Sequence, residues 1–175
     1  MIEWWVIADE KDDRIGRMTG PYFDVPCALG RGGLVAAADK KEGDGKTPMG
    51  SWPVRRILYR PDKEEEPVSK FPITALSPTT GWCDAPQDTA YNQIVRHPWR
   101  ASAEQLWRDD DVYDLIMVLG HNDDPVVPGS GSAIFVHIAR EGFTPTEGCV
   151  AIAHDAIRKL ITLMDIKDRI VIKRV

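Results

Sequence analysis

Short apolar runs, each ended by glycine, proline or aspartate, follow one another along this chain. They are rich in valine, isoleucine and aromatic residues, which favour extended structure. The pattern predicts strands at residues 3–8, 22–29, 52–59, 113–119, 133–139 and 169–173. The 14 glycines and 13 prolines are spread through the sequence. This arrangement is typical of many short strands joined by turns and not of a helical bundle.

Two segments have helical signals. Residues 156–164 carry apolar side chains at i, i+3, i+4 and i+7, which places them on one helix face, and Asp155 is a candidate N-cap. A second, shorter helix is predicted at 103–108, where Ser102 and Gln105 have the spacing of a capping box. The sequence therefore predicts a mostly β protein with minor α content and a helix packed late in the chain.

Length and composition limit the possibilities further. We expect one domain over residues 1–175, because no linker, repeat or low-complexity tract divides the chain. The acidic run 62–66 reads as a solvated loop tip. With 22 basic and 27 acidic residues the net charge is −5, which argues against nucleic acid as a partner. No apolar run is long enough for a transmembrane helix. No signal peptide is visible, because the apolar run at the N-terminus is short and nothing basic precedes it.

One glycine-rich segment resembles a phosphate-binding loop only in part. Residues 43–47 read Gly-Asp-Gly-Lys-Thr, but Lys40 stands where the first glycine of a P-loop would be. No periodic apolar stripe follows to form the helix that a P-loop requires. We therefore reject phosphate binding and interpret the segment as a glycine-rich hairpin connection.

His137 and Cys149 are the candidate reactive pair. His137 lies inside the predicted strand 133–139, and the sequence Thr-Glu-Gly-Cys-Val follows at 146–150. A thiol at a glycine turn lies beside free backbone N–H groups, and Gly148 leaves room for a substrate. A nearby imidazole lowers the pKa of a thiol. The alternatives are a hydrogen-bonded core histidine and a buried, unreactive cysteine.

These motifs resemble the L,D-transpeptidase catalytic domain, the YkuD domain. Residues 134–152 resemble its active-site segment, an apolar strand ending in histidine, then a loop, then Ser/Thr-x-Gly-Cys. Residues 43–52 resemble its Thr-Pro-x-Gly turn, and 129–135 resemble the lead into the histidine strand. The resemblance covers about 28–152 and is nearest to a short single-domain subgroup. It implies a single-domain β-sandwich with a late packed helix.

The resemblance also implies a reaction. The Cys149 thiolate would attack an amide carbonyl, His137 would take the thiol proton, and N–H groups around Gly148 and Cys149 would hold the oxyanion. Peptidoglycan stem peptides would supply both donor and acceptor, in a 3-3 or an unusual 1-3 crosslink. No metal or other cofactor is required. The expected location is the periplasm or cell envelope.

Five further residues are candidates for substrate binding. Arg140 ends the histidine strand and suits a substrate carboxylate, with a surface ion pair as the alternative. Thr146 either hydrogen-bonds near His137 or shapes the turn. His121 lines the same cleft or is a polar loop residue. Trp82 belongs to a loop rich in proline, glycine and aspartate that is expected to cap the cleft, and Tyr91 lies beyond that loop.

The chain also departs from the family pattern, and other functions remain open. Glu147 stands where the family commonly has a second histidine, and Ala151 where an arginine or asparagine is common. Water as acceptor would give an L,D-carboxypeptidase or endopeptidase with the same residues. A third class is a non-catalytic module that binds wall peptides. A fourth is a zinc hydrolase, whose ligands would be His121, Asp123, His137 and Cys149.

Overall fold

The computed structural model describes all 175 residues, Met1–Val175, and most of its strands belong to one curved sheet. The hydrogen-bonded order is β10-β11-β12-β3-β2-β1-β13-β5-β4, with β6 beside β5. The strands of this sheet are β1 (Glu3–Ala8), β2 (Ile15–Gly20), β3 (Phe23–Ala28), β4 (Leu34–Ala36), β5 (Thr47–Tyr59), β6 (Ile73–Ala75), β10 (Leu115–Leu119), β11 (Phe135–Ile138), β12 (Val150–Ile152) and β13 (Arg169–Lys173).

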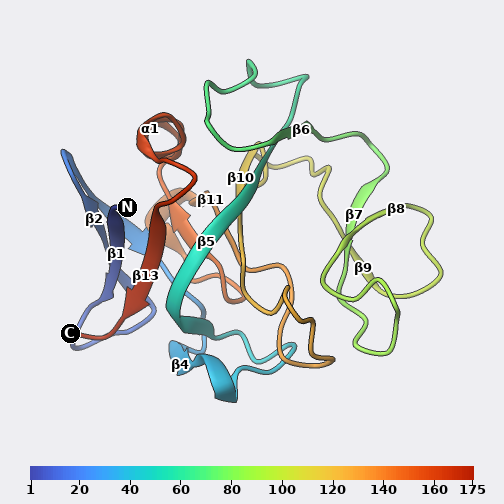
Figure 1. Ribbon diagram of the computed structural model, residues 1–175, viewed down its shortest axis with the longest axis horizontal. Helices are drawn as coiled ribbons and strands as arrows, with labels where there is room; N and C mark the ends of the chain where they lie inside the picture. Colours follow the sequence, from blue (N-terminus) through green and yellow to red (C-terminus); the bar gives the residue numbers. More distant parts are fainter.

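The sheet closes on itself because β10 pairs with β5 as well as with β11. Its concave side holds the main apolar core, which contains Val6, Ile57, Met117 and Val136. The helix α1 (His154–Leu163) packs against β10 and β11 and buries its apolar face in that core (Figure 1). No helix of the chain has the length and apolar character needed to cross a membrane.

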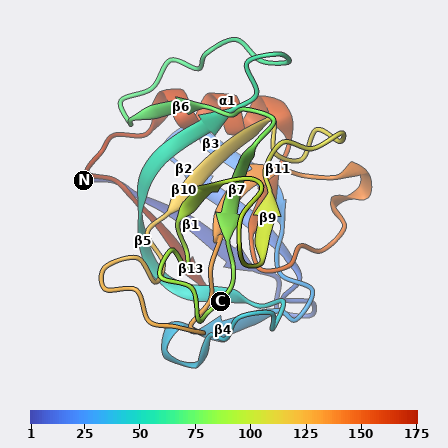
Figure 2. The same cartoon turned by 90° about the vertical axis from the view of Figure 1, so that its right-hand side faces the viewer.

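A second, three-stranded sheet lies to one side of the main sheet (Figures 1 and 2). Its order is β8-β7-β9, from β7 (Thr80–Cys83), β8 (Ile94–Arg96) and β9 (Ala103–Gln105), and we call it the cap sheet. A separate apolar cluster joins it to the outer face of β10 and β11. That cluster includes Trp82, Ile116, Phe135 and Cys149, so the candidate nucleophile lies at the junction between the two sheets.

The predicted fold class, mostly β with a late packed helix, is confirmed. Each of the six predicted strands coincides with an observed strand or overlaps one, and the late helix begins two residues earlier than expected. The strands β2, β4, β6, β7, β8 and β12 were not predicted. Most of them are three or four residues long, too short to show a period in the sequence.

Three local predictions were wrong. Residues 103–105 form β9, because pairing with β7 outweighs the weak preference of a six-residue segment for helix. The N-cap of α1 is Ala153, and Asp155 lies in the first turn. The segment 43–47 is not a hairpin connection, because β4 and β5 pair in parallel and η1 (Ala37–Asp39) lies between them.

The acidic run 62–66 is also less free than expected. The Glu64 carboxylate bonds His154 Nε2 and Arg158 Nη1 of α1, each at 2.5 Å. The loop is therefore attached to the helix by charge pairs, although Glu65 and Glu66 remain exposed.

Candidate active site

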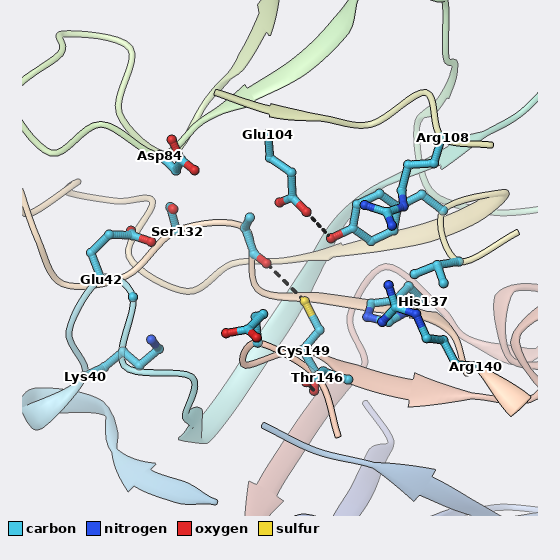
Figure 3. A pocket seen from close by; sticks show the side chains of 15 residues that line it. Lys40, Glu42, Asp84, Glu104, Arg108, Ser132, His137, Arg140, Thr146 and Cys149 are labelled. Atoms are coloured by element: carbon cyan, nitrogen blue, oxygen red, sulfur yellow. Dashed lines mark hydrogen bonds between the residues drawn. The ribbon is translucent and has the colours of Figure 1, made fainter. Parts of the chain in front are cut away.

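A cavity of about 390 Å³ opens between the main sheet and the cap sheet (Figure 3). Cys149 and His137 both line it, together with Arg140 and Thr146 among the predicted substrate-binding residues. The other lining residues are Lys40, Glu42, Gly43, Asp84, Glu104, Arg108, Val112, Tyr113, Ser132, Ala133 and Glu147.

Cys149 occupies the last position before β12. Its side chain is buried, with 6% of the residue exposed, and Sγ lies 3.2 Å from the carbonyl oxygen of Ala133 (Figure 3). Because a carbonyl only accepts, the sulfur must be the donor and therefore carries its proton. The backbone N–H of Cys149 makes no hydrogen bond within the chain. This N–H is therefore free to hold a developing oxyanion.

The turn before Cys149 is held by Thr146. The Gly148 N–H donates to Thr146 Oγ1 at 3.1 Å, and that hydroxyl donates to the Cys149 carbonyl at 2.7 Å. The Gly148 N–H is therefore engaged, whereas that of Cys149 is not. Gly148 has φ of +134°, and a Cβ there would lie 2.8 Å from the Lys46 carbonyl oxygen. The segment that resembles the Thr-Pro-x-Gly turn thus packs beneath the cysteine turn and requires glycine at 148.

His137 lies on β11, directly beside β12. The two strands pair in parallel, with His137 opposite Ala151, so their register brings the histidine and the cysteine turn to one cavity. His137 Nδ1 is 2.9 Å from the Ile138 carbonyl oxygen. This contact requires Nδ1 to carry the proton, which leaves Nε2 as the acceptor. Nε2 makes no hydrogen bond within the chain.

Burial controls the ionisation of both groups. It lowers the pKa of His137 to about 4 and raises the pKa of Cys149 to about 12. At His137, burial outweighs the hydrogen bond to the Ile138 carbonyl, which by itself raises the pKa. At Cys149, burial outweighs the nearby positive charge of Lys40, which by itself lowers the pKa. Without substrate the pair is therefore a neutral thiol and a neutral imidazole. The thiolate must form as the imidazole removes the proton during attack.

Tyr113 holds the histidine ring from the side. Its ring packs edge-on against His137, with 5.4 Å between centroids, and against Phe135 at 5.9 Å. Its hydroxyl donates to Glu104 of β9 at 2.6 Å. This contact connects the cap sheet to the wall of the cavity. Burial raises the pKa of Tyr113, so its hydroxyl stays protonated at neutral pH.

Three predicted substrate-binding residues lie outside the cavity lining. Trp82 Nε1 and the Ala133 N–H both donate to Asn92 Oδ1, each at 3.0 Å. Asn92 therefore connects Trp82 to Ala133, whose carbonyl accepts the hydrogen bond from the Cys149 thiol. Tyr91 donates to Glu42 at 2.5 Å and accepts from the Gly131 N–H.

His121 is the third of these residues. It is 4% exposed, and its Nε2 lies 2.9 Å from the Ser130 carbonyl. Its ring packs edge-on against Trp52 at 4.9 Å. These contacts place His121 beneath the loop that leads to the histidine strand.

Sequence reasoning missed several residues that line the cavity. Arg108 fell inside a wrongly predicted helix, and Glu104 belongs to the strand that replaced it. Lys40 and Glu42 precede the glycine-rich segment and match no motif. Asp84 directly follows β7 and also matches no motif. The positions of Asp84, Glu104 and Arg108 depend on how the cap sheet packs, for which local sequence carries no signal.

The structure contains no set of ligands for the zinc hydrolase alternative. No three histidine, cysteine, aspartate or glutamate side chains lie close enough together to hold a metal ion. His121 and His137, which that alternative would use together, bond separate carbonyls, and Asp123 pairs with Arg55 at 2.7 Å.

The chain is similar to one family of known proteins along almost its whole length. A family model described as the L,D-transpeptidase catalytic domain, YkuD, matches residues 3–172. One similar solved structure is that of Bdellovibrio bacteriovorus Bd1075, with 15% sequence identity and a TM-score of 0.45. The similarity covers 97% of this chain but only 47% of that one, so this chain spans about half its length. No curated protein sequence matches the chain.

Proposed function

The chain belongs to the L,D-transpeptidase catalytic domain family, and on that premise we propose that it is a cysteine-dependent L,D-transpeptidase that crosslinks peptidoglycan through a thioester at Cys149. The match confirms the family resemblance and the β-sandwich-like fold expected from the motifs. Proteins of this family act on peptidoglycan peptides. We further propose that residues 1–175 act as a single catalytic domain and work in the cell envelope.

One observation carries the proposal. Cys149 and His137 line the same cavity, and the only nitrogen of His137 without a partner is the one that can accept a proton. The Ile138 carbonyl holds the tautomer that a general base needs, and the Cys149 N–H is a free donor at the nucleophile. A core histidine and a structural cysteine would not require this combination.

In the first half-reaction, Sγ of Cys149 attacks the carbonyl carbon on the L side of a D-residue. His137 Nε2 takes the thiol proton as the C–S bond forms, and the Cys149 N–H stabilises the oxyanion. The C–N bond then breaks, and the imidazolium returns its proton to the leaving nitrogen. The products are an acyl thioester on Cys149 and a free amine.

In the second half-reaction an acceptor amine enters where the leaving amine stood. His137 Nε2 takes a proton from this amine as it attacks the thioester, and the departing sulfur recovers the proton. Neither step requires a cofactor. Water in place of the amine would give an L,D-carboxypeptidase or endopeptidase with the same residues.

The test is mass spectrometry of products formed from purified disaccharide-tetrapeptide muropeptides. The wild-type protein should form a crosslinked dimer that lacks the leaving residue, and fragmentation distinguishes a 3-3 from a 1-3 bond. Cys149→Ala should form none. Cys83→Ala is the matched control, because Cys83 is buried in β7 outside the cavity and its loss should leave the product unchanged.

Other outcomes would contradict the proposal in different ways. Loss of the D-residue without a dimer would identify a hydrolase that uses the same cysteine. Tight binding of muropeptides by both wild type and Cys149→Ala, without turnover or thioester, would identify a wall-peptide-binding module.

A further inference from the structure

Two arginines converge on one carboxylate at the His137 end of the cavity. Arg108 donates from Nε and Nη2 to the two oxygens of Asp110, each at 2.7 Å. Arg140 Nη2 lies 3.7 Å from the same carboxylate. Asp110 alone forms ion pairs with the two guanidinium groups, and Glu104, the other carboxylate near Arg108, accepts the Tyr113 hydroxyl. Both arginines line the cavity that contains Cys149.

Donors on both arginines are available to a ligand. The Arg140 guanidinium makes no hydrogen bond within the chain, and 49% of the side chain is exposed. Arg108 Nη1 also has no partner. The Arg108 guanidinium lies over the Tyr113 ring at 5.5 Å, and the same ring packs on His137. The arginine pair is therefore held in a defined position relative to the proposed general base.

The opposite end of the cavity carries two carboxylates beside Lys40, whose ammonium already pairs with Asp44 at 2.6 Å. In Figure 3, Glu42 and Asp84 lie on the far side of Cys149 from Arg108 and Arg140. The Asp84 carboxylate makes no hydrogen bond or ion pair, and its Oδ1 is buried. A carboxylate placed at this end would meet repulsion, so the charge distribution orients a substrate that carries one.

Chemistry fixes where a substrate carboxylate must lie. His137 Nε2 has to reach the leaving nitrogen to return a proton to it. The carbon bonded to that nitrogen carries a free carboxylate if the leaving residue is a terminal D-amino acid. The same holds for a D-glutamate joined onward through its side chain, as in a 1-3 crosslink. In both cases the carboxylate lies two bonds from the nitrogen, on the side where the arginines flank His137.

We propose that Arg108 and Arg140 form a carboxylate clamp that binds the α-carboxylate of the leaving D-residue and then the carboxylate beside the acceptor amine. The inference rests on the proposed function and names the substrate carboxylate as the group that this active site recognises. One clamp serves both halves of the reaction because the leaving and the entering amines occupy the same position. Asp110 positions the two guanidinium groups and does not contact the substrate.

The experiment compares stem tetrapeptides in which single carboxyl groups are converted to carboxamides. One peptide is amidated at its C-terminal D-residue, and another at the α-carboxyl of its D-glutamate. Acylation of Cys149 is followed by intact-protein mass in single-turnover runs. The measured quantity is the ratio of the acylation rate constant to the peptide dissociation constant. Amidation next to the scissile bond should lower this ratio about 10- to 100-fold, because a hydrogen bond to a charged group is lost. Amidation elsewhere should change it less than threefold.

Variants assign this selectivity to the arginines. Arg140→Gln and Arg108→Gln should lower the rate with the native peptide by a similar factor and leave the rate with the amidated peptide almost unchanged. Arg140→Lys should recover part of the loss. Arg96→Gln is the control, because Arg96 is exposed on β8 and outside the cavity. Arg140 is half exposed, so its variant tests the clamp even if Arg108→Gln fails to fold.

The outcomes separate this inference from the proposed function. Equal acylation by native and amidated peptides, with Cys149 still acylated, would overturn the clamp and leave the transpeptidase proposal in place. Equal sensitivity of both peptides to Arg140→Gln would also overturn it, because the arginine would then act only on the fold. No Cys149 acylation by any peptide would overturn both.

Discussion

Thr146 and Cys149 are joined by a 2.7 Å hydrogen bond from the threonine hydroxyl to the cysteine carbonyl. The same hydroxyl accepts the Gly148 N–H at 3.1 Å, so one side chain holds both peptide groups that flank the turn. This turn orients the Cys149 N–H and thiol toward the cavity. The candidate nucleophile is therefore positioned by a side chain three residues before it.

Replacing Thr146 should lower both the acylation rate and the stability of the fold. In Thr146→Val the Gly148 N–H loses its buried partner, at a cost of about 1–3 kcal/mol. The Cys149 carbonyl keeps only the Thr47 hydroxyl, at 3.5 Å. The acylation rate of Cys149 should fall more than tenfold, and the denaturant midpoint should also fall. Thr146→Ser keeps the hydroxyl and should retain most of the rate. If Thr146→Val acylates as fast as wild type, the hydroxyl does not position the nucleophile.

Glycine at 148 should be far less replaceable than glycine at 142. A Cβ at Gly148 would meet the Lys46 carbonyl at 2.8 Å, whereas one at Gly142, where φ is +73°, would meet nothing within 4 Å. Gly142→Ala should therefore cost about 1–2 kcal/mol, the strain of a left-handed residue. Gly148→Ala should cost more and abolish acylation. Urea unfolding and single-turnover mass spectrometry measure the two effects, and equal losses in both variants would contradict this account of Gly148.

The dependence on pH should reflect a neutral resting pair. Because burial lowers the pKa of His137 to about 4, the imidazole stays neutral and able to accept a proton well below its ordinary value. The acidic limb of the acylation rate should therefore lie near pH 4, not near 6.5. Alkylation of Cys149 by iodoacetamide should keep rising with pH beyond 9, because burial raises the thiol pKa to about 12. A plateau in alkylation near pH 7 would instead indicate a thiolate–imidazolium pair.

The contact between α1 and the acidic loop should make stability depend on pH. Burial opposes the charged form of His154, but hydrogen bonds to Glu64 and Asp155 outweigh it and raise the pKa. The stabilisation is therefore full below about pH 6.5, the ordinary value, and is lost as pH rises through the raised pKa. It should amount to less than about 1 kcal/mol, because His154 is partly exposed. Urea unfolding between pH 5 and 9 should show this decline in wild type.

A matched variant isolates that contribution. His154→Gln removes the titrating group and should flatten the decline, while Lys159→Gln, on the same helix but without a contact to Glu64, should not. An unchanged decline in His154→Gln would assign the pH dependence to another group.

The sequence by itself determined much of the fold and singled out the candidate reactive pair. Short apolar runs rich in valine, isoleucine and aromatic residues located segments such as 3–8 and 169–173, and a period of 3.6 located α1, because these patterns are local in the sequence. The spacing from His137 to Gly148 and Cys149 is also local. This spacing could therefore be recognised without any knowledge of how the strands pair.

The tertiary structure alone decided how that pair is held and what surrounds it. The tautomer of His137, the free N–H of Cys149 and the neutral state of both side chains depend on burial and on hydrogen bonds within the assembled sheets. Arg108 reaches the cavity only because β9 pairs with β7 across 20 or more residues of chain. Such pairing depends on contacts between distant segments, and no local propensity encodes them.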